Sequence, residues 1–420
     1  RAAQDHSHST ASPPKTSGSM TLLRIAMTPS RQVQAEQAIY SGMSWLSAFV
    51  LARNLGLEVF GRYAGLLLAA YFAMSISQAL WVQPMQVSWS KWGATPGYVA
   101  WNVRGVTALA ILLSAGGWTM EAAGLYAGWA GWGGMLAAGM VGYDFLRKLL
   151  ITSGQTQELL RAGTVMLWGQ LAVLALSFAP SANFSGVVSG MAAVYVLAAA
   201  AALPKGIFQT SHKDNVLFFR DAWQQSRWLL PTALIQWWSG NFFVLSAGLL
   251  ISPAALGALR LAQSVFGVFN LLLQSYENLL TPQAARAWQT GSAAACIGQV
   301  SRRWLWPMAA AVVLTGAAAG PVLSYLGVSL EGDLQGQVFV GMALLYLLIL
   351  INYPIRIHLR VSGRNDLFFK GYVLALLFSL LTVNPLLEHW QILGALIGLG
   401  GAQLLLTGFW ATQIQIWKRP

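Results

Sequence analysis

The chain has 420 residues, of which 56% are hydrophobic and only 9% are charged. Soluble proteins carry roughly a quarter of their residues as charges, so this composition indicates a polytopic membrane protein. The 25 basic and 13 acidic residues give a net charge of +12, which in a soluble protein would suggest nucleic acid as a partner. A single cysteine, Cys296, excludes a disulfide framework and a cysteine-based metal site.

The chain begins with a polar segment, residues 1–33, that is rich in Ser, Thr, Pro and Gly. It has no apolar core of the kind found in signal peptides, and it predicts a disordered cytoplasmic tail. His6 and His8 are expected to be solvated there and to hold no metal.

The rest of the chain consists of long stretches without Lys, Arg, Asp or Glu, each close to the roughly 20 residues of a membrane-spanning helix. These stretches are 63–90, 105–120, 122–143, 162–204, 228–259, 261–276, 304–330, 334–355, 371–387 and 389–417. Pro180 and Asn183 divide the fourth stretch into two helices, and residues 34–52 form one more apolar run. We therefore predict an all-α membrane protein with about twelve transmembrane helices.

The basic residues predict how these helices are oriented, because short cytoplasmic loops collect Lys and Arg. If both termini are cytoplasmic, 22 of the 25 basic residues fall in inner segments. Only Arg53, Arg62 and Arg260 fall in outer segments. The excess positive charge is therefore interpreted as a topology signal, and no nucleic-acid partner is expected.

Two similar segments indicate an internal repeat. Residues 51–63 follow the first predicted helix and residues 250–259 follow the seventh, and each contains a glycine, Gly61 or Gly257, that opens the next helix. Because six helices separate the two segments, both halves enter the membrane in the same orientation. The prediction is two pseudo-symmetric six-helix bundles with a cleft between them. The first bundle comprises 34–204, a cytoplasmic linker comprises 205–227, and the second bundle comprises 228–420.

The sequence Ala52-Arg-Asn-Leu-Gly-Leu-Glu-Val-Phe-Gly-Arg-Tyr63 resembles the A-R-x-L-G-x-x-x-F-G-x-Y turn of Wzx-type polysaccharide flippases. These proteins belong to the multidrug/oligosaccharidyl-lipid/polysaccharide exporter superfamily. The match at 257–282 and the basic loop Arg360–Asn365 are also similar to that family, and the resemblance spans about residues 34–417. The sequence Ile251-Ser-Pro-Ala in the second turn departs from the more glycine-rich motif that is usual there.

This resemblance implies a multi-pass protein of the bacterial inner membrane that flips undecaprenyl-diphosphate-linked glycan by alternating access. The product would serve surface polysaccharides such as lipopolysaccharide or exopolysaccharide. The expected partners are the lipid-linked glycan, membrane lipid and other polysaccharide assembly proteins.

A sugar-diphosphate headgroup cannot enter hydrocarbon, so such a protein needs a polar cleft, preferably a cationic one. Five polar residues of the eighth predicted helix recur 3, 7, 4 and 3 positions apart and share one helical face. They are Arg260, Gln263, Asn270, Gln274 and Glu277. Further cleft candidates on other helices are Gln236, Asn241, Gln78, Arg104 and Glu36.

Each candidate also has a structural interpretation. Arg260 could extend to the headgroups, Glu277 could pair with Arg286, and Arg104 could anchor its helix at the membrane surface. The Asn and Gln side chains could hydrogen-bond between helices. Glycines of the predicted helices 4 and 12 are expected to permit close helix contacts. They are Gly124, Gly128, Gly131, Gly134, Gly394 and Gly398.

Catalysis, cofactors and metals are not expected. No Ser/His/Asp or paired-carboxylate arrangement occurs, and the glycines at 56–61 lack the Lys-Ser/Thr of a phosphate loop. One alternative is a cation-coupled multidrug exporter of the same superfamily, although the cleft would then need more acidic residues. A membrane glycan polymerase or ligase is another alternative, but it would need a larger outer loop than this chain has.

Overall fold

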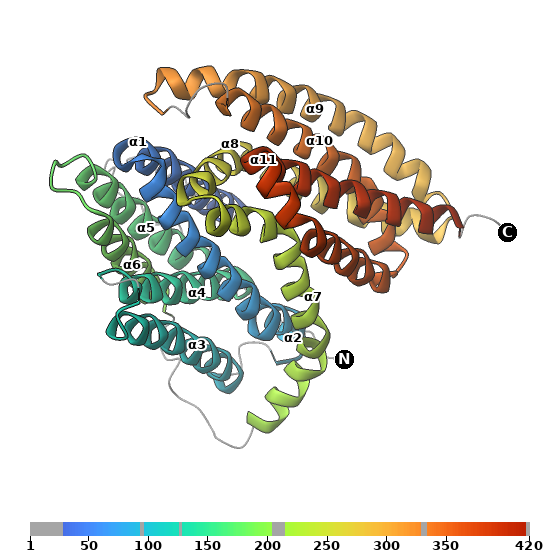
Figure 1. Ribbon diagram of the computed structural model, residues 1–420. Helices are drawn as coiled ribbons and strands as arrows, with labels where there is room; N and C mark the ends of the chain where they lie inside the picture. Colours follow the sequence, from blue (N-terminus) through green and yellow to red (C-terminus); the bar gives the residue numbers. More distant parts are fainter. Residues whose placement is uncertain (1–27, 93–95, 126–127, 204–214, 329–333, 417–420) are drawn as a thin grey trace, which may run out of the picture.

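A computed structural model describes residues 28–92, 96–125, 128–203, 215–328 and 334–416, and these are almost entirely helical (Figure 1). Most of the predicted tail lies outside the described residues, and helix begins at Pro29.

The N-terminal half consists of seven consecutive helical elements. They are α1 (Pro29–Ser77), η1 (Gln78–Val82), α2 (Gln83–Trp92), α3 (Pro96–Ala122), α4 (Ala130–Thr152), α5 (Thr156–Leu176) and α6 (Phe184–Ala201). Helix α1 bends at Gly56, whose φ of +80° is readily adopted only by glycine, and so makes two crossings. The second arm of α1 continues through one π-helical turn, η1, into α2. The half therefore contains six crossings.

The C-terminal half has the same number of crossings in five elements. They are α7 (Asn215–Leu250), α8 (Pro253–Gln289), α9 (Ala293–Tyr325), α10 (Leu334–Val361) and α11 (Asn365–Ile416). Helix α11 bends at Gln391, where φ is +47°, and makes the last two crossings. Helix α8 begins with an N-cap, because the Ser252 side chain accepts a hydrogen bond from the Ala255 N–H and Pro253 needs no donor partner.

Nine helical stretches of the described chain are long and apolar enough to cross a membrane. Two of them, Arg31–Trp89 and Asp366–Ile414, contain the bends and count twice. Helix α4 is the remaining crossing, with 23 residues that include Asp144 and Arg147. The prediction of twelve transmembrane helices in an all-α fold is therefore confirmed.

The fourth helix lies later in the chain than predicted. Gly124 and Gly128 have φ of +75° and +87° and lie in the turn before α4, so they do not mediate the predicted helix contact. Gly134 does, because a Cβ there would lie 2.5 Å from the Leu113 carbonyl oxygen. The stretch without charged residues predicts that this helix ends at residue 143. Ion pairs inside the bundle allow charged residues within α4, which therefore continues to Thr152. The predicted linker is likewise helical from Asn215 onward.

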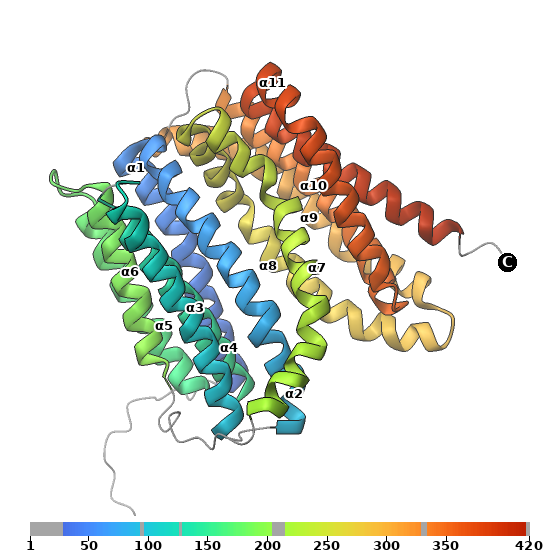
Figure 2. The ribbon, with the colours of Figure 1, turned by 60° about the horizontal axis from the view of Figure 1, so that its bottom comes forward.

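The two halves meet through a limited set of elements. Helix α8 contacts α1, and α7 contacts α1, η1, α2 and α3. Figure 2 shows α3–α6 on one side of these elements and α9–α11 on the other. Below, the bend end is the end of the molecule where α1 bends, α7 turns into α8 and α11 bends. It is the end predicted to face outward.

Candidate functional site between the two halves

At the bend end, the backbones of α1 and α8 touch through two glycines. A Cβ atom on Gly61 would lie 1.7 Å from the Pro253 carbonyl oxygen, and one on Gly257 would lie 2.4 Å from the Leu57 carbonyl oxygen. No other residue type fits at either position. The two segments that were similar in sequence therefore meet each other, and their glycines allow the halves to join at this end.

Toward the opposite end, α8 separates from the N-terminal half. Residues 255–262 are all buried except Arg260. Beyond Gly267, buried residues recur only every third or fourth position, at Phe269, Leu273, Tyr276 and Leu280. This buried face packs against α9 and α10, so the other faces of α8 are no longer covered.

Helix α7 instead contacts the N-terminal half along its length. The Phe72 and Trp237 rings lie 4.8 Å apart, and the Ser226 hydroxyl donates to the Leu80 carbonyl oxygen at 3.2 Å. Further from the bend end, Ser88 donates to Asp221 at 2.7 Å, which links α2 with α7 (Figure 2). The halves are thus joined along the side of α2 and α7, while beyond Gly267 much of α8 is exposed.

Arg260 lies where α8 begins to separate, about 10 Å along the helix from its first residue. Its guanidinium lies 5.5 Å from the ring centroid of Tyr71, which belongs to the other half, and donates to the Gln263 Oε1 at 2.9 Å. No carboxylate of the described chain lies within ion-pairing distance of it. The interface therefore contains an arginine that forms no ion pair with any carboxylate in the part of the chain that the structure describes.

The five polar residues that share one face of α8, from Arg260 to Glu277, are called the α8 stripe below. Its members beyond Arg260 have different partners. Asn270 is exposed and donates to the Tyr346 hydroxyl of α10 at 3.0 Å. Gln274 is exposed. Glu277 forms an ion pair with Arg360 of α10, not with Arg286. The stripe thus combines one cation near the bend end, exposed amides midway and a neutralised carboxylate further on.

The candidates on α7 and α3 lie on helices other than α8. Asn241 donates to the Trp237 carbonyl oxygen of its own helix at 2.9 Å. Gln236 is exposed on α7, and Arg104 is exposed on α3.

Glu36 lies inside the N-terminal bundle, and its side chain is 0% exposed. Both carboxylate oxygens accept from the Arg147 Nε at 2.7 Å, and Tyr143 donates to one of them at 3.2 Å. Arg147 also donates to Gln37 and lies 4.9 Å from the Tyr40 ring centroid. These contacts satisfy the carboxylate within the bundle and neutralise it.

A second buried acid, Asp144, lies in the same bundle. Lys148, one turn later in α4, forms an ion pair with it at 3.1 Å, and Gln78 of η1 donates to it at 3.0 Å. Gln78 therefore connects the π-helical turn with α4. In the sequence, Arg147 and Lys148 belong to the 22 basic residues that mark inner segments. The i, i+4 spacing of Asp144 and Lys148 is the signal that could have indicated an intrahelical pair.

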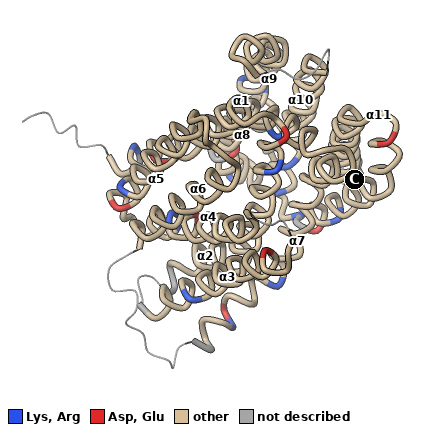
Figure 3. Tube along the Cα trace, turned by 60° about the vertical axis from the view of Figure 1, so that its left-hand side comes forward, with Lys and Arg blue, Asp and Glu red and all other residues tan. Residues whose placement is uncertain are grey.

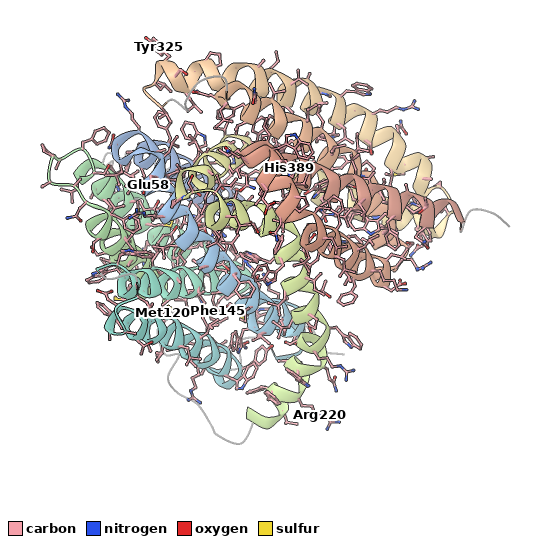
Figure 4. All side chains as sticks on the ribbon, in the orientation of Figure 1. Glu58, Met120, Phe145, Arg220, Tyr325 and His389 are labelled. Atoms are coloured by element: carbon pink, nitrogen blue, oxygen red, sulfur yellow. The ribbon has the colours of Figure 1, made fainter. Side chains whose placement is uncertain are left out.

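Charged residues are few along the chain (Figure 3). Some mark helix ends, such as Glu58 beside the bend of α1 and Arg220 in the first turns of α7 (Figure 4). Arg147 and Lys148 lie within the helices and form ion pairs with Glu36 and Asp144. Arg260 also lies within a helix, but it forms no such pair among the described residues. Chemically, the interface can therefore attract an anion.

No family model and no curated protein matches the sequence. Solved structures do match. An inward-facing multidrug resistance MATE transporter of the MOP superfamily has a TM-score of 0.62 at 11% identity, covering 94% of this chain and 99% of that chain. The lipid II flippase MurJ, in an inward closed conformation, has a TM-score of 0.69 at 8% identity, covering 92% and 87%. A eukaryotic MATE transporter, AtDTX14, has a TM-score of 0.54 at 14% identity, covering 92% and 96%.

These similarities establish a fold shared with MOP superfamily transporters and confirm the twelve-helix pseudo-symmetric architecture. The similar structures are transporters and not enzymes.

Proposed function

We propose that this multi-pass membrane protein, which has the fold of MOP superfamily transporters, flips a lipid-diphosphate-linked oligosaccharide from the cytoplasmic to the outer leaflet. The observation that carries the proposal is Arg260, an arginine between the halves without a carboxylate partner among the described residues. A charge inside a membrane is costly, and at the bilayer centre it costs about 2.5–3.5 kcal/mol by insertion scales. An anionic headgroup would compensate this charge, and a guanidinium binds diphosphate oxygens through a fork of donors.

The uneven separation of the halves suits a substrate with two unlike parts. The headgroup needs the polar face of α8, where Asn270 and Gln274 are exposed. The lipid tail must stay in the bilayer, and its lateral path would run beside the part of α8 beyond Gly267, where residues such as Val268 and Leu272 are exposed. The side of α2 and α7 stays joined through Ser88, Asp221 and Gln225.

Alternating access would follow from breaking one set of contacts and making another. With both termini in the cytoplasm, as predicted, the joined bend end faces outward. Rocking of the halves would separate Gly61 from Gly257 and bring the far part of α8 toward α1. With the cytoplasm negative, outward movement of net negative charge is favoured by about 2.3 kcal/mol per charge per 100 mV.

A cation-coupled multidrug exporter remains the second candidate, since two of the similar structures are MATE transporters. A cationic substrate needs an uncompensated carboxylate. Glu36, Asp144 and Glu277 each form an ion pair with a basic side chain. The charge distribution therefore favours an anionic substrate.

The proposed setting is the bacterial inner membrane, where undecaprenyl-diphosphate-linked glycan, membrane lipid and other polysaccharide assembly proteins would be the partners. Deleting the gene in its source cell should leave lipid-linked glycan on the cytoplasmic leaflet and reduce surface glycan. Wild-type protein and the Glu58→Gln variant, which changes only an exposed ion pair with Arg62, should both restore export. Normal surface glycan in the deletion strain would refute the proposal.

A further inference from the structure

A cavity of about 690 Å³ lies in the C-terminal half, at the end opposite the bend end. It is lined by the end of α8, the start of α9, the end of α10 and both ends of α11. Its polar lining comprises Trp288, His358, Ser362, Arg364 and Gln413. None of these residues has a part in the proposed transport path.

The cavity lies at the level of a membrane surface, because several membrane spans end around it. The spans Pro253–Gln289 and Leu334–Val361 end there, and the span Asp366–Ile414 both begins and ends there. Trp288 is 44% exposed and its ring lies 5.5 Å from the His358 ring. Tryptophan favours the headgroup region, which agrees with this depth.

The cavity has two chemically different walls. Leu359, Leu367 and Ile414 form an apolar wall, while Arg364 and His358 contribute basic groups. Arg364 forms an ion pair with Asp366 at 3.2 Å, in which both side chains are partly exposed. Such a pair is weak, and the five N–H donors of a guanidinium allow it to bind a phosphate beside the carboxylate. An amphiphile with an anionic head matches both walls.

We propose that this cavity binds an anionic phospholipid, with its phosphate at Arg364 and His358 and an acyl chain along the apolar wall. Basic pockets between transmembrane helices at the cytoplasmic surface attract anionic lipid headgroups. The predicted topology places this end in the cytoplasm, and Lys370 adds further positive charge nearby. This site involves none of the residues that the transport proposal assigns to the substrate.

Native mass spectrometry of the full chain in detergent can test the site with phosphatidylglycerol and phosphatidylcholine of identical acyl chains. The wild-type protein should bind phosphatidylglycerol about fivefold more tightly, the contribution of one basic side chain near a charged surface. Arg364→Gln should remove this preference. Ala294→Trp should weaken binding of both lipids, because it fills the cavity and keeps both basic groups.

Arg303→Gln is the matched control, since Arg303 is exposed on α9 outside the cavity and its variant should keep the preference. Thermal unfolding identifies any variant that fails to fold, and Ala294→Trp and Arg364→Gln disturb the site by independent means. Unchanged lipid binding in both variants would overturn the proposal. Competition by glycerol phosphate without acyl chains, as strong as that by phosphatidylglycerol, would overturn the lipid assignment in favour of a free phosphate.

Discussion

The interior of the N-terminal bundle and the interface between the halves both contain charged groups within the membrane-spanning region, but they use them differently. In the bundle, Arg147 neutralises Glu36 and Lys148 neutralises Asp144. At the interface, Arg260 lies over the Tyr71 ring and donates to Gln263, and it forms no ion pair with a carboxylate of the described residues. The bundle charges therefore stabilise one packing arrangement, whereas the interface charge can respond to a ligand.

A second difference separates the two sides of the interface. The backbones of α1 and α8 touch at Gly61 and Gly257 near the bend end, whereas hydrogen bonds and aromatic contacts hold α7 along the N-terminal half. For transport, the contact between Gly61 and Gly257 must break easily, and the charge of Arg260 must be available to the substrate.

Replacing Glu36 with alanine should destabilise the protein most, because it leaves Arg147 buried without a counterion. Breaking a buried pair in this way costs about 3–5 kcal/mol. Thermal unfolding of the purified protein and its level in the membrane measure the effect. Glu58→Ala, which removes an exposed ion pair with Arg62, should cost less than about 1 kcal/mol. Equal stability of the two variants would contradict a structural role for the bundle charges.

Gly61→Ala should disfavour the joined bend end, because its Cβ collides with the backbone of Pro253. Overpacking costs about 1–3 kcal/mol, which shifts the equilibrium by about fivefold to a hundredfold. A Leu57→Cys probe in a Cys296→Ser background should react faster with an impermeant maleimide. Gly42→Ala is the control, since a Cβ at Gly42 meets no atom within 4 Å. An unchanged labelling rate in Gly61→Ala would argue against the glycine contact as the closed end.

Ser88→Ala should have a smaller effect on the other side of the interface. It removes the hydrogen bonds that link Ser88 with Asp221 and Gln225 of α7, each contributing about 1 kcal/mol. Cysteine crosslinking between α2 and α7 should become slower by about fivefold or more. The exposed Ser275→Ala on α8, which loses only a bond to its own helix, should leave the rate unchanged. If Ser88→Ala crosslinks at the wild-type rate, these bonds do not hold the two helices together.

The amino-acid sequence predicted the twelve helices and the two corresponding glycines well, because hydrophobic stretches and turn residues are local features. It placed α4 wrongly, since one ion pair that allows charges in this helix, Arg147 with Glu36, joins residues that are distant in sequence. Glu36 and Arg147 are 111 positions apart, and nothing local indicates that they meet. The orientation of the termini stays a prediction.

The α8 stripe illustrates the same limit. Its spacing places five polar residues on one helical face, but it cannot show that Arg360 neutralises Glu277 or that Asn270 contacts Tyr346. Nor can it distinguish Arg260 from Arg147 as the charge without an acidic partner. That distinction comes from three-dimensional contacts between helices. Which stripe residues meet a substrate stays a prediction.

Flipping of a fluorescent lipid-diphosphate glycan in proteoliposomes tests the central claim most directly. Wild-type protein should accelerate movement between leaflets, and Arg260→Gln should slow it at least about tenfold, since a hydrogen bond to a charged group contributes about 1.5–3 kcal/mol. Arg62→Gln, at an exposed position of the same interface end, should retain the wild-type rate. Flipping by Arg260→Gln at the wild-type rate would contradict the assignment of this arginine to the anionic headgroup.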